Sequence, residues 1–257
     1  MAENFSPTKL EYYENMWKLQ STSILLSSFQ GEDGRQVLIL DSTIFHPQGG
    51  GQPADTGVIT SAGFKFVVQE VRSKDKIVYH YGFFDNSENE ALKKNLEKGA
   101  EVLLQVDAER RKLNSRLHSA GHLLDVCMTN VGLGHLEPAK GYHFPDGPFV
   151  EYKGTAPQNE LQNKQQHLEL EANNLIAKGG KVFVATLPYN EAAELCGGCL
   201  PDYIPKESSP RIVRLGENPG CPCGGTHVSD LSEILGIKVS QIRTKKRMTK
   251  VFYNVES

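Results

Sequence analysis

Three histidines and one cysteine fall in two short motifs whose spacing suits a metal ion. His118 and His122 stand four residues apart and flank three small residues. In a helix this spacing places both imidazoles on one face, about one turn apart, where both can reach one ion. Much later, Cys223 and His227 flank Gly-Gly-Thr, a segment too rich in glycine for a good helix. Such a loop can wrap around an ion, and the four nitrogen and sulfur donors together predict one Zn²⁺.

Catalysis does not follow from the ligands alone. Histidine pairs at this spacing arise on helices by chance, so the metal site depends on the second motif. Four protein ligands describe a closed structural site, whereas hydrolytic zinc usually keeps one position for water. The ion could expand its coordination, release a ligand, or orient a substrate while another residue activates water. Gly121 costs a helix about 1 kcal/mol relative to alanine, which indicates that something approaches the backbone there.

The helix that carries the first histidine pair is predicted over 108–130, where apolar residues recur at helical spacing after the N-cap Asp107. Strands are predicted over 141–144, 148–152, 182–186, 211–215, 239–243 and 250–255, and further helices over 159–177, 190–195 and 230–235. The last two strands pair as a hairpin. We expect a two-layer α+β domain with mainly antiparallel strands.

The N-terminal part alternates short β-rich runs with turn signals, which predicts a small β-barrel. These runs cover 24–29, 36–40, 58–60, 64–72 and 77–81. The polar stretch 85–99 is a linker or an exposed helix, and 101–107 is a further strand. We place the boundary near residue 100, with a barrel domain over 1–100 and the metal-containing domain over 101–257.

The amino-acid composition restricts the possible class of protein only weakly. The chain has 257 residues, 39% of them hydrophobic, which is enough to bury a sizeable core in one or two domains. The formal net charge of −3 gives no overall attraction to polyanions, so a nucleic-acid contact would need a local basic patch. No signal peptide or membrane-spanning run is visible, and the odd number of cysteines, five, favours reduced thiols or metal ligands. We expect a soluble, cytoplasmic protein without a membrane partner.

Basic residues cluster twice, and either cluster could contact phosphate or simply be solvated. The first cluster, Arg110, Arg111, Lys112 and Arg116, leads into the histidine motif, and the second is Arg243, Lys245, Lys246, Arg247 and Lys250. Cys196 and Cys199 form a CxxC pair to which Cys221 adds one more sulfur. A second metal site would lack a ligand, and we favour reduced thiols near the first site over a redox pair.

The motifs also carry a family resemblance. The segments 118–124 and 223–228, together with the glycine-rich 47–52 followed by Asp55 and Gly57, resemble the editing region of alanyl-tRNA synthetase and its free-standing relatives, the AlaX proteins. The resemblance covers nearly the whole chain, and the three motifs occur in family order. It implies an N-terminal β-barrel followed by the editing fold that alanyl- and threonyl-tRNA synthetases share.

The resemblance also implies an activity, which is the trans-acting hydrolysis of tRNA(Ala) wrongly charged with serine or glycine. The partner would be the acceptor end of that tRNA. His118, His122, Cys223 and His227 fall on the family's zinc ligands. Family members often carry a polar residue before the Lys-Gly pair that follows the first motif, and here that residue is Ala139. Recognition of serine therefore needs another hydrogen-bonding group.

Candidates for this group and for catalysis each have a structural alternative as strand or loop residues. They are Ser119, Thr226, His143 and Tyr142. We assign substrate contacts to Gly50, Gly51, Gln52, Lys140, Gly141 and Arg116. The run of glycines from 49 to 51 could contact an RNA phosphate through its backbone N–H groups, or it could be a tight turn between strands.

Three functions compete at this stage. A zinc-dependent aminoacyl-tRNA deacylase is the first, and a non-catalytic tRNA-binding module with a structural zinc is the second. A metallohydrolase acting on another small ester is the third. A complete synthetase is not expected, because the chain is short and carries no ATP-binding signature.

Overall fold

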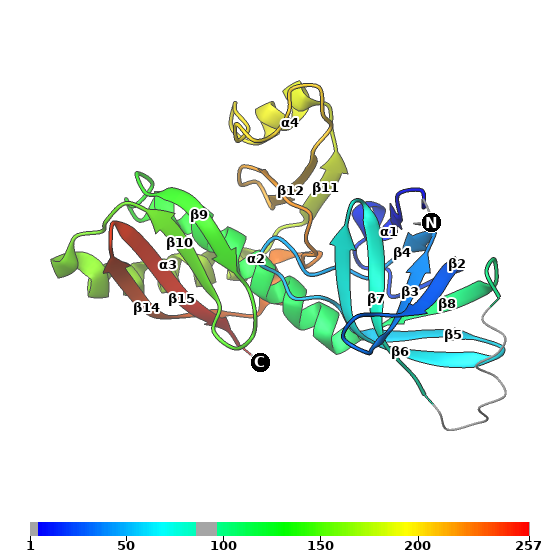
Figure 1. Cartoon of the computed structure of the whole chain (residues 1–257). Helices are drawn as coiled ribbons and strands as arrows, with labels where there is room; N and C mark the ends of the chain where they lie inside the picture. The colour runs from blue at the N-terminus through cyan, green and yellow to red at the C-terminus, as the bar shows by residue number, and fades with distance from the viewer. Residues whose placement is uncertain (1–4, 86–96, 257) are drawn as a thin grey trace. The chain divides into compact units, whose positions relative to one another are not determined.

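The computed structural model describes residues 5–85 and 97–256, which form two compact units (Figure 1). The first comprises the described residues of 1–49 and 53–111, and the second comprises 50–52 and those of 112–257. The boundary differs from the predicted cut near residue 100, because Glu101–Val106 (β8) pairs with two strands of the first unit. Most of the predicted polar stretch, 86–96, lies outside the described residues.

The first unit is a closed β-barrel with the strand order β2-β3-β7-β6-β5-β8, as the sequence predicted. The strands preceding β8 are β2 (Gln20–Gln30), β3 (Gln36–Leu40), β5 (Gly57–Ser61), β6 (Phe64–Lys74) and β7 (Ile77–Phe84). Alternation of side chains directs one face of each strand inward, and β8 shows it most clearly with every second residue buried. Leu38, Ile59, Phe66 and Leu104 are among the buried residues of this core.

Three short elements of the first unit were not predicted from the sequence, because runs this brief carry no periodic signal. They are β1 (Lys9–Leu10), α1 (Glu11–Glu14) and β4 (Ser42–Thr43). The strands β1 and β4 pair in parallel.

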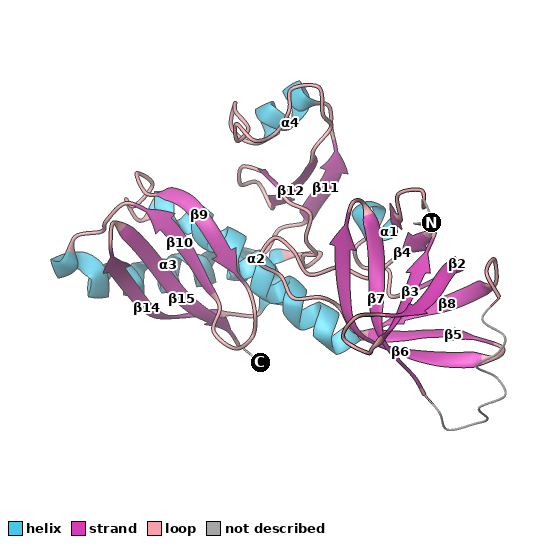
Figure 2. Cartoon of the chain, viewed as in Figure 1, coloured by secondary structure: helices cyan, strands magenta, loops and turns pink. Residues whose placement is uncertain are grey.

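A four-stranded antiparallel sheet with the order β14-β15-β10-β9 forms one layer of the second unit (Figure 2). Its strands are β9 (Glu137–Tyr142), β10 (Phe149–Lys153), β14 (Ile237–Lys245) and β15 (Met248–Val255). The helices are α2 (Ala108–Asn130), which begins within the first unit, and α3 (Leu161–Lys178). Hydrogen bonds from Tyr152 and Tyr253 to α2 show that one face of the sheet meets this helix. The predicted α+β architecture is confirmed.

The strand expected over 141–144 runs instead over Glu137–Tyr142. The first four residues of β9 are all exposed, so no alternation of polar and apolar residues marked them. The helix expected over 230–235 is a single 3-10 turn, η3 (Leu231–Ile234), which the Asp230 side chain caps at Ser232 N. The predicted hairpin is present, with Arg243 opposite Lys250.

A smaller three-stranded sheet leads to the second motif. It consists of β11 (Val182–Thr186), β12 (Arg211–Leu215) and β13 (Cys221–Pro222), with α4 (Tyr189–Leu195) between the first two strands; η2 (Gln158–Glu160) precedes α3. Because β13 ends at Pro222, Cys223 begins the loop directly from the sheet edge. No helix among the described residues is long and apolar enough to cross a membrane.

Candidate metal centre

Two imidazoles of the candidate centre come from neighbouring turns of α2. The rings of His118 and His122 lie 4.9 Å apart between centroids and are nearly parallel, at 19°. Gly121, which lies between them, has a packing role, because a Cβ at this position would lie 2.3 Å from Cε1 of His143. The helix therefore needs glycine here so that a third imidazole can approach its backbone.

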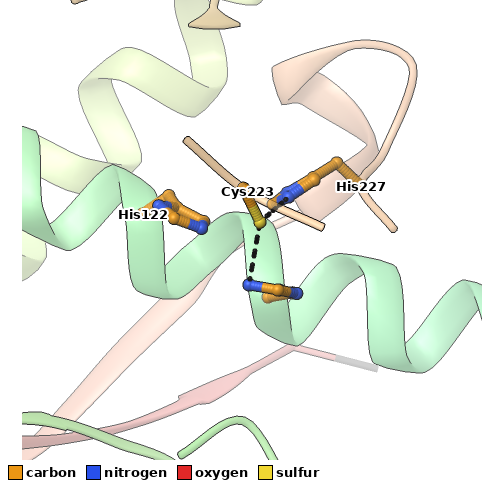
Figure 3. A group of neighbouring side chains, drawn as sticks. His122, Cys223 and His227 are labelled. Atoms are coloured by element: carbon orange, nitrogen blue, oxygen red, sulfur yellow. Dashed lines mark hydrogen bonds between the residues drawn. The ribbon is translucent and has the colours of Figure 1, made fainter. Parts of the chain in front are cut away.

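The other two side chains come from the loop after β13 (Figure 3). Arg211, on the adjacent strand β12, donates from Nη1 to the carbonyl oxygens of Cys223 (2.7 Å) and Gly225 (3.0 Å). A Cβ at Gly225 would lie 2.2 Å from His118 Cε1, so only glycine lets the loop pass this close to α2. One arginine and one glycine thus hold Cys223 and His227 against the histidine pair.

The four predicted ligand residues come together. Their donor atoms all lie within 4.8 Å of one another, an arrangement that could hold a metal ion. Cys223 Sγ lies 3.6 Å from Nε2 of His118 and 3.3 Å from Nε2 of His227. Burial raises the pKa of the Cys223 thiol, against the lowering effect of the Gly225 N–H and of Arg211. Metal binding would therefore have to displace the thiol proton.

Hydrogen bonds on the far side of two rings orient Nε2 toward the cluster. His118 donates from Nδ1 to Gln52 Oε1 at 2.7 Å, and Nδ1 of His227 lies 3.1 Å from Ser119 Oγ. Gln52 is itself fixed, because Oε1 accepts from Thr226 N (2.9 Å) and Nε2 donates to Thr226 Oγ1 (2.9 Å). Metal-binding histidines characteristically use one ring nitrogen for the ion and the other for such a partner.

His122 provides a separate observation. Its Nε2 is buried and has no hydrogen-bond partner among the residues that the structure describes, while Nδ1 lies 3.2 Å from Cys221 Sγ. Burial lowers the pKa of His122 to about 4, so the ring is neutral at physiological pH. A buried nitrogen with a free lone pair is costly unless it binds something, and an ion at the cluster would satisfy it.

His143 stacks on this cluster without belonging to the ligand group. Its ring lies 4.5 Å from that of His118 at 23°, and Nδ1 lies 2.7 Å from the hydroxyl of Tyr253. Because that hydroxyl donates to Leu117 O at 2.8 Å, we assign the proton of this contact to His143 Nδ1. Burial, with a smaller effect of His122, lowers the pKa of His143 to about 3. His143 is thus a neutral ring whose Nε2 carries the lone pair.

The glycine-rich loop reaches this centre. Gly50–Gln52 belong to the second unit although the chain on both sides belongs to the first. A Cβ at Gly51 would lie 2.4 Å from Gly141 O, and Gly51 O accepts from His143 N at 2.8 Å. Gly50 is exposed, whereas Gln52 is fully buried against His118 and Thr226. Among the residues assigned to substrate contact, Gln52 hydrogen-bonds to the candidate ligand His118, and its contact with substrate stays a prediction.

The remaining predicted residues divide between supporting and exposed positions. Ser119 and Thr226 are fully buried and hydrogen-bonded beside the ligands. Arg116 is also buried, and its guanidinium donates to the carbonyl oxygens of Ile234 and Glu256, so it stabilises the fold from within. Lys140 is exposed on β9.

Other predicted groups lie apart from the ligands. The first basic cluster is partly internal too, since Arg111 pairs with the buried Asp55. All five cysteines are free thiols, and Cys196 and Cys199 are not part of the metal-ligating group found in the described residues.

Two residues that support the centre were not predicted from the sequence. Arg211 and Tyr253 stand alone in β-strands, where neither spacing nor a motif distinguishes them from ordinary strand residues. Their roles arise only when β12 meets the second-motif loop and when β15 meets α2.

The fold and the site define a class: a β-barrel unit and an α+β unit whose histidines and cysteine form a candidate metal centre. Sequence comparisons agree with it. The family model "tRNA synthetases class II (A)" matches residues 4–110. The alanyl-tRNA editing protein AlaX-L of Pyrococcus horikoshii is 29% identical over 92% of this chain and 55% of its own length. Alanine–tRNA ligases of Methanosarcina mazei and Leptospira biflexa are 28% and 30% identical over 90% and 81% of this chain.

The chain is similar to the alanyl-tRNA editing protein and to the alanine–tRNA ligases, which confirms the resemblance that its motifs predicted. It spans about half of the length of AlaX-L and about a quarter of the M. mazei ligase, 55% and 24% respectively.

Proposed function

We propose that the chain is a zinc-dependent, trans-acting deacylase that hydrolyses tRNA(Ala) mischarged with serine or glycine, in the cytoplasm. The observation that carries the proposal is the gathering of His118, His122, Cys223 and His227, with donor atoms within 4.8 Å of one another. The similarity to AlaX-L, which is named as an alanyl-tRNA editing protein, supports the reaction class.

The donor set supports zinc as the ion. Bond lengths of about 2.3 Å to sulfur and about 2.0–2.1 Å to nitrogen place these atoms about 3.5 Å apart at a tetrahedral ion. The sulfur-to-nitrogen distances from Cys223 to His118 and His227, 3.6 and 3.3 Å, agree with this value. Nε2 of His122, which has no hydrogen-bond partner within the described part of the chain, would provide a third nitrogen.

The ester of an aminoacyl-tRNA is already activated, so positioning of water and stabilisation of the oxyanion suffice without a covalent nucleophile. A bound zinc ion would supply Lewis-acid polarisation of the ester carbonyl. Gln52 and Ser119 hold two ligand imidazoles in orientation. His143, neutral because burial lowers its pKa to about 3, is a weak base, so we assign it the task of accepting a hydrogen bond.

One observation favours a second function. Four protein ligands leave no open position on a tetrahedral ion, which is typical of structural zinc. The alternative is therefore a tRNA-binding module without catalysis. It requires that chelation unfolds the second unit while the intact, metal-loaded protein leaves the ester untouched.

The test is a deacylation assay with Ser-tRNA(Ala), Gly-tRNA(Ala) and Ala-tRNA(Ala). We expect the metal-loaded protein to release serine and glycine faster than alanine. His122→Ala should reduce the rate to that of the uncatalysed ester, because it removes a ligand. His167→Ala is the matched control, since His167 is exposed on α3. If all three aminoacyl-tRNAs are hydrolysed only at the background rate, the deacylase is rejected and the non-catalytic tRNA-binding module is favoured.

A further inference from the structure

The outer face of the four-stranded sheet is exposed to solvent, and its aromatic and basic side chains lie in separate rows. Its opposite face holds the buried Val150, Tyr152, Val251 and Tyr253, and both tyrosines bond to α2. Because side chains alternate along a strand, the residues between these point away from the helix. The outward-facing residues of these described strands are all partly or fully exposed, so this face meets solvent.

Strand register groups the outer residues into rows across the sheet. One row is aromatic: Phe149 lies opposite both Tyr142 and Phe252. Ring centroids are 5.3 Å apart between Tyr142 and Phe149 and 5.6 Å apart between Phe149 and Phe252. Phe144 extends the row and stacks on Tyr142 at 4.6 Å and 12°. Half-exposed rings in a continuous row offer flat surfaces on which planar ligands can stack.

The next row is basic. Lys140 lies opposite Glu151, which lies opposite Lys250, which in turn lies opposite Arg243. Glu151 is the acid of this row and pairs with Lys250 at 3.3 Å. Lys250 also joins the two rows, because its Nζ lies 3.9 Å from the centre of the Phe149 ring.

A pocket of ≈ 340 Å³ lies on the hairpin side of this face. Its lining is Glu151, Arg243, Lys245, Lys246, Met248, Lys250 and Phe252. Cations outnumber the single carboxylate there, although the whole chain carries a net charge of −3. Local positive charge on an acidic chain is the complement of a polyanion.

We propose that this outer face, defined by the aromatic row and the adjoining basic row, binds single-stranded RNA. Bases stack on the ring of Phe252, and Arg243, Lys245 and Lys250 contact the phosphates. Aromatic rings beside basic residues on a solvent-facing sheet are a recurrent means of holding single strands. The inference rests on the proposed function, in that the substrate is an RNA, and it names the surface that holds an unpaired segment of it.

Fluorescence anisotropy with a labelled, uncharged RNA of about 12 nucleotides tests the proposal, a length within the usual site size of such surfaces. The charge variant is Arg243→Gln, Lys245→Gln and Lys250→Gln in the full, zinc-loaded chain. We expect its binding to weaken about tenfold or more at low salt. The slope of log affinity against log salt should fall by about 2, since each lost phosphate contact contributes about 0.7. The matched control, Lys178→Gln, Lys181→Gln and Lys206→Gln, removes three exposed charges elsewhere in the unit.

A second variant separates stacking from charge. Phe252→Leu keeps an apolar side chain against Phe149 but removes the ring, and we expect binding of the single strand to weaken by several-fold. Retained zinc affinity in a chelator competition shows that the variant is folded. Three results would each overturn the proposal. The first is that the control triple variant weakens RNA binding as much as the charge variant does, and the second is that Phe252→Leu binds the single strand as tightly as the wild type. The third is that the wild type binds a duplex of the same length with equal affinity.

The proposal would also be overturned if the charge variant lost binding to anionic vesicles while its binding of RNA stayed unchanged. Because the probe carries no amino acid, the result does not depend on hydrolysis. A chain that binds the single strand through this face yet deacylates nothing would reject the deacylase alone.

Discussion

The side chains around the candidate metal centre have two different roles. Four provide donor atoms, and a second group fixes the orientation of those donors. Gln52 belongs to the second group, because its amide joins His118 to the backbone and the side chain of Thr226. The amide oxygen accepts from the ring and therefore sets its tautomer, leaving Nε2 free for an ion. The glycine-rich motif thus reaches the centre through the residue that ends it.

Replacing Gln52 by alanine should weaken zinc binding about 10- to 100-fold, the usual cost of losing such a partner. Chelator competition measures this directly. Gln52→Glu keeps an acceptor for His118 Nδ1 and should recover most of the affinity. Gln48→Ala is the matched control, because Gln48 is exposed in the same loop. Equal affinities for wild type and Gln52→Ala would contradict an orienting role.

Among the elements, α2 shows how a helix is adapted to a site. The predicted range, 108–130, is confirmed, and the apolar residues that predicted it repeat at helical spacing from Leu113 to Met128. Gly121 was predicted to admit a close approach, and the structure identifies His143 as the group that approaches. The identity of that neighbour could not be predicted, because it comes from a loop after β9.

Gly121→Ala should lower the free energy of unfolding by about 1–2 kcal/mol. Alanine favours the helix by about 1 kcal/mol, but overpacking costs about 1–3 kcal/mol and more against a rigid ring. The new Cβ would lie 2.3 Å from His143 Cε1. Denaturant unfolding measures the change. In Gly63→Ala nothing lies within 4 Å of the added carbon, so its stability should remain close to that of the wild type. A Gly121→Ala protein as stable as wild type would argue that the ring moves freely.

The barrel contains its own titrating group, the fully buried His80. Its Nδ1 donates to Leu38 O at 3.1 Å and Nε2 accepts from Thr43 Oγ1 at 2.9 Å, so the neutral ring is satisfied. Burial lowers its pKa from 6.5 to about 4. The unfolded chain therefore takes up a proton before the folded chain does, and stability falls as the pH falls from 6.5 toward 4.

The loss due to His80 should approach about 3 kcal/mol at pH 4. Urea unfolding of the zinc-loaded protein at a series of pH values measures the slope between pH 6.5 and pH 5. Burial raises the pKa of Asp125 to about 6, so that group titrates in the same range, and the contribution of His80 is the difference between wild type and His80→Asn. His80→Asn should flatten this slope, whereas the exposed His167→Asn should leave it unchanged. Identical slopes in wild type and His80→Asn would show that His80 does not cause the dependence.

For the whole molecule, local patterns predicted more than long-range contacts did. The barrel, the long helix and the four clustered side chains each follow from periodicity or from spacing within a motif. The contact of Gln52 with His118 joins residues 66 positions apart, and that of Arg111 with Asp55 joins residues 56 positions apart. Neither contact has a local signal, and Arg111 reads in the sequence as one member of a surface basic cluster. The compact units divide after residue 111 and not near residue 100 for the same reason, because pairing to distant strands places β8 in the barrel.

Metal removal should act on the two units unequally. All four candidate ligands belong to the second unit, so binding energy stabilises that unit directly. At a free zinc concentration about 1,000 times the dissociation constant the gain is about 4 kcal/mol. Hydrogen exchange with and without a chelator measures it at each amide. We expect protection to fall in the part of α2 from residue 112 onward and in the loop from Cys223 to His227, while β3 and β6 exchange as before. Equal loss of protection in the barrel strands would mean that both units open together, through the helix that runs from one into the other.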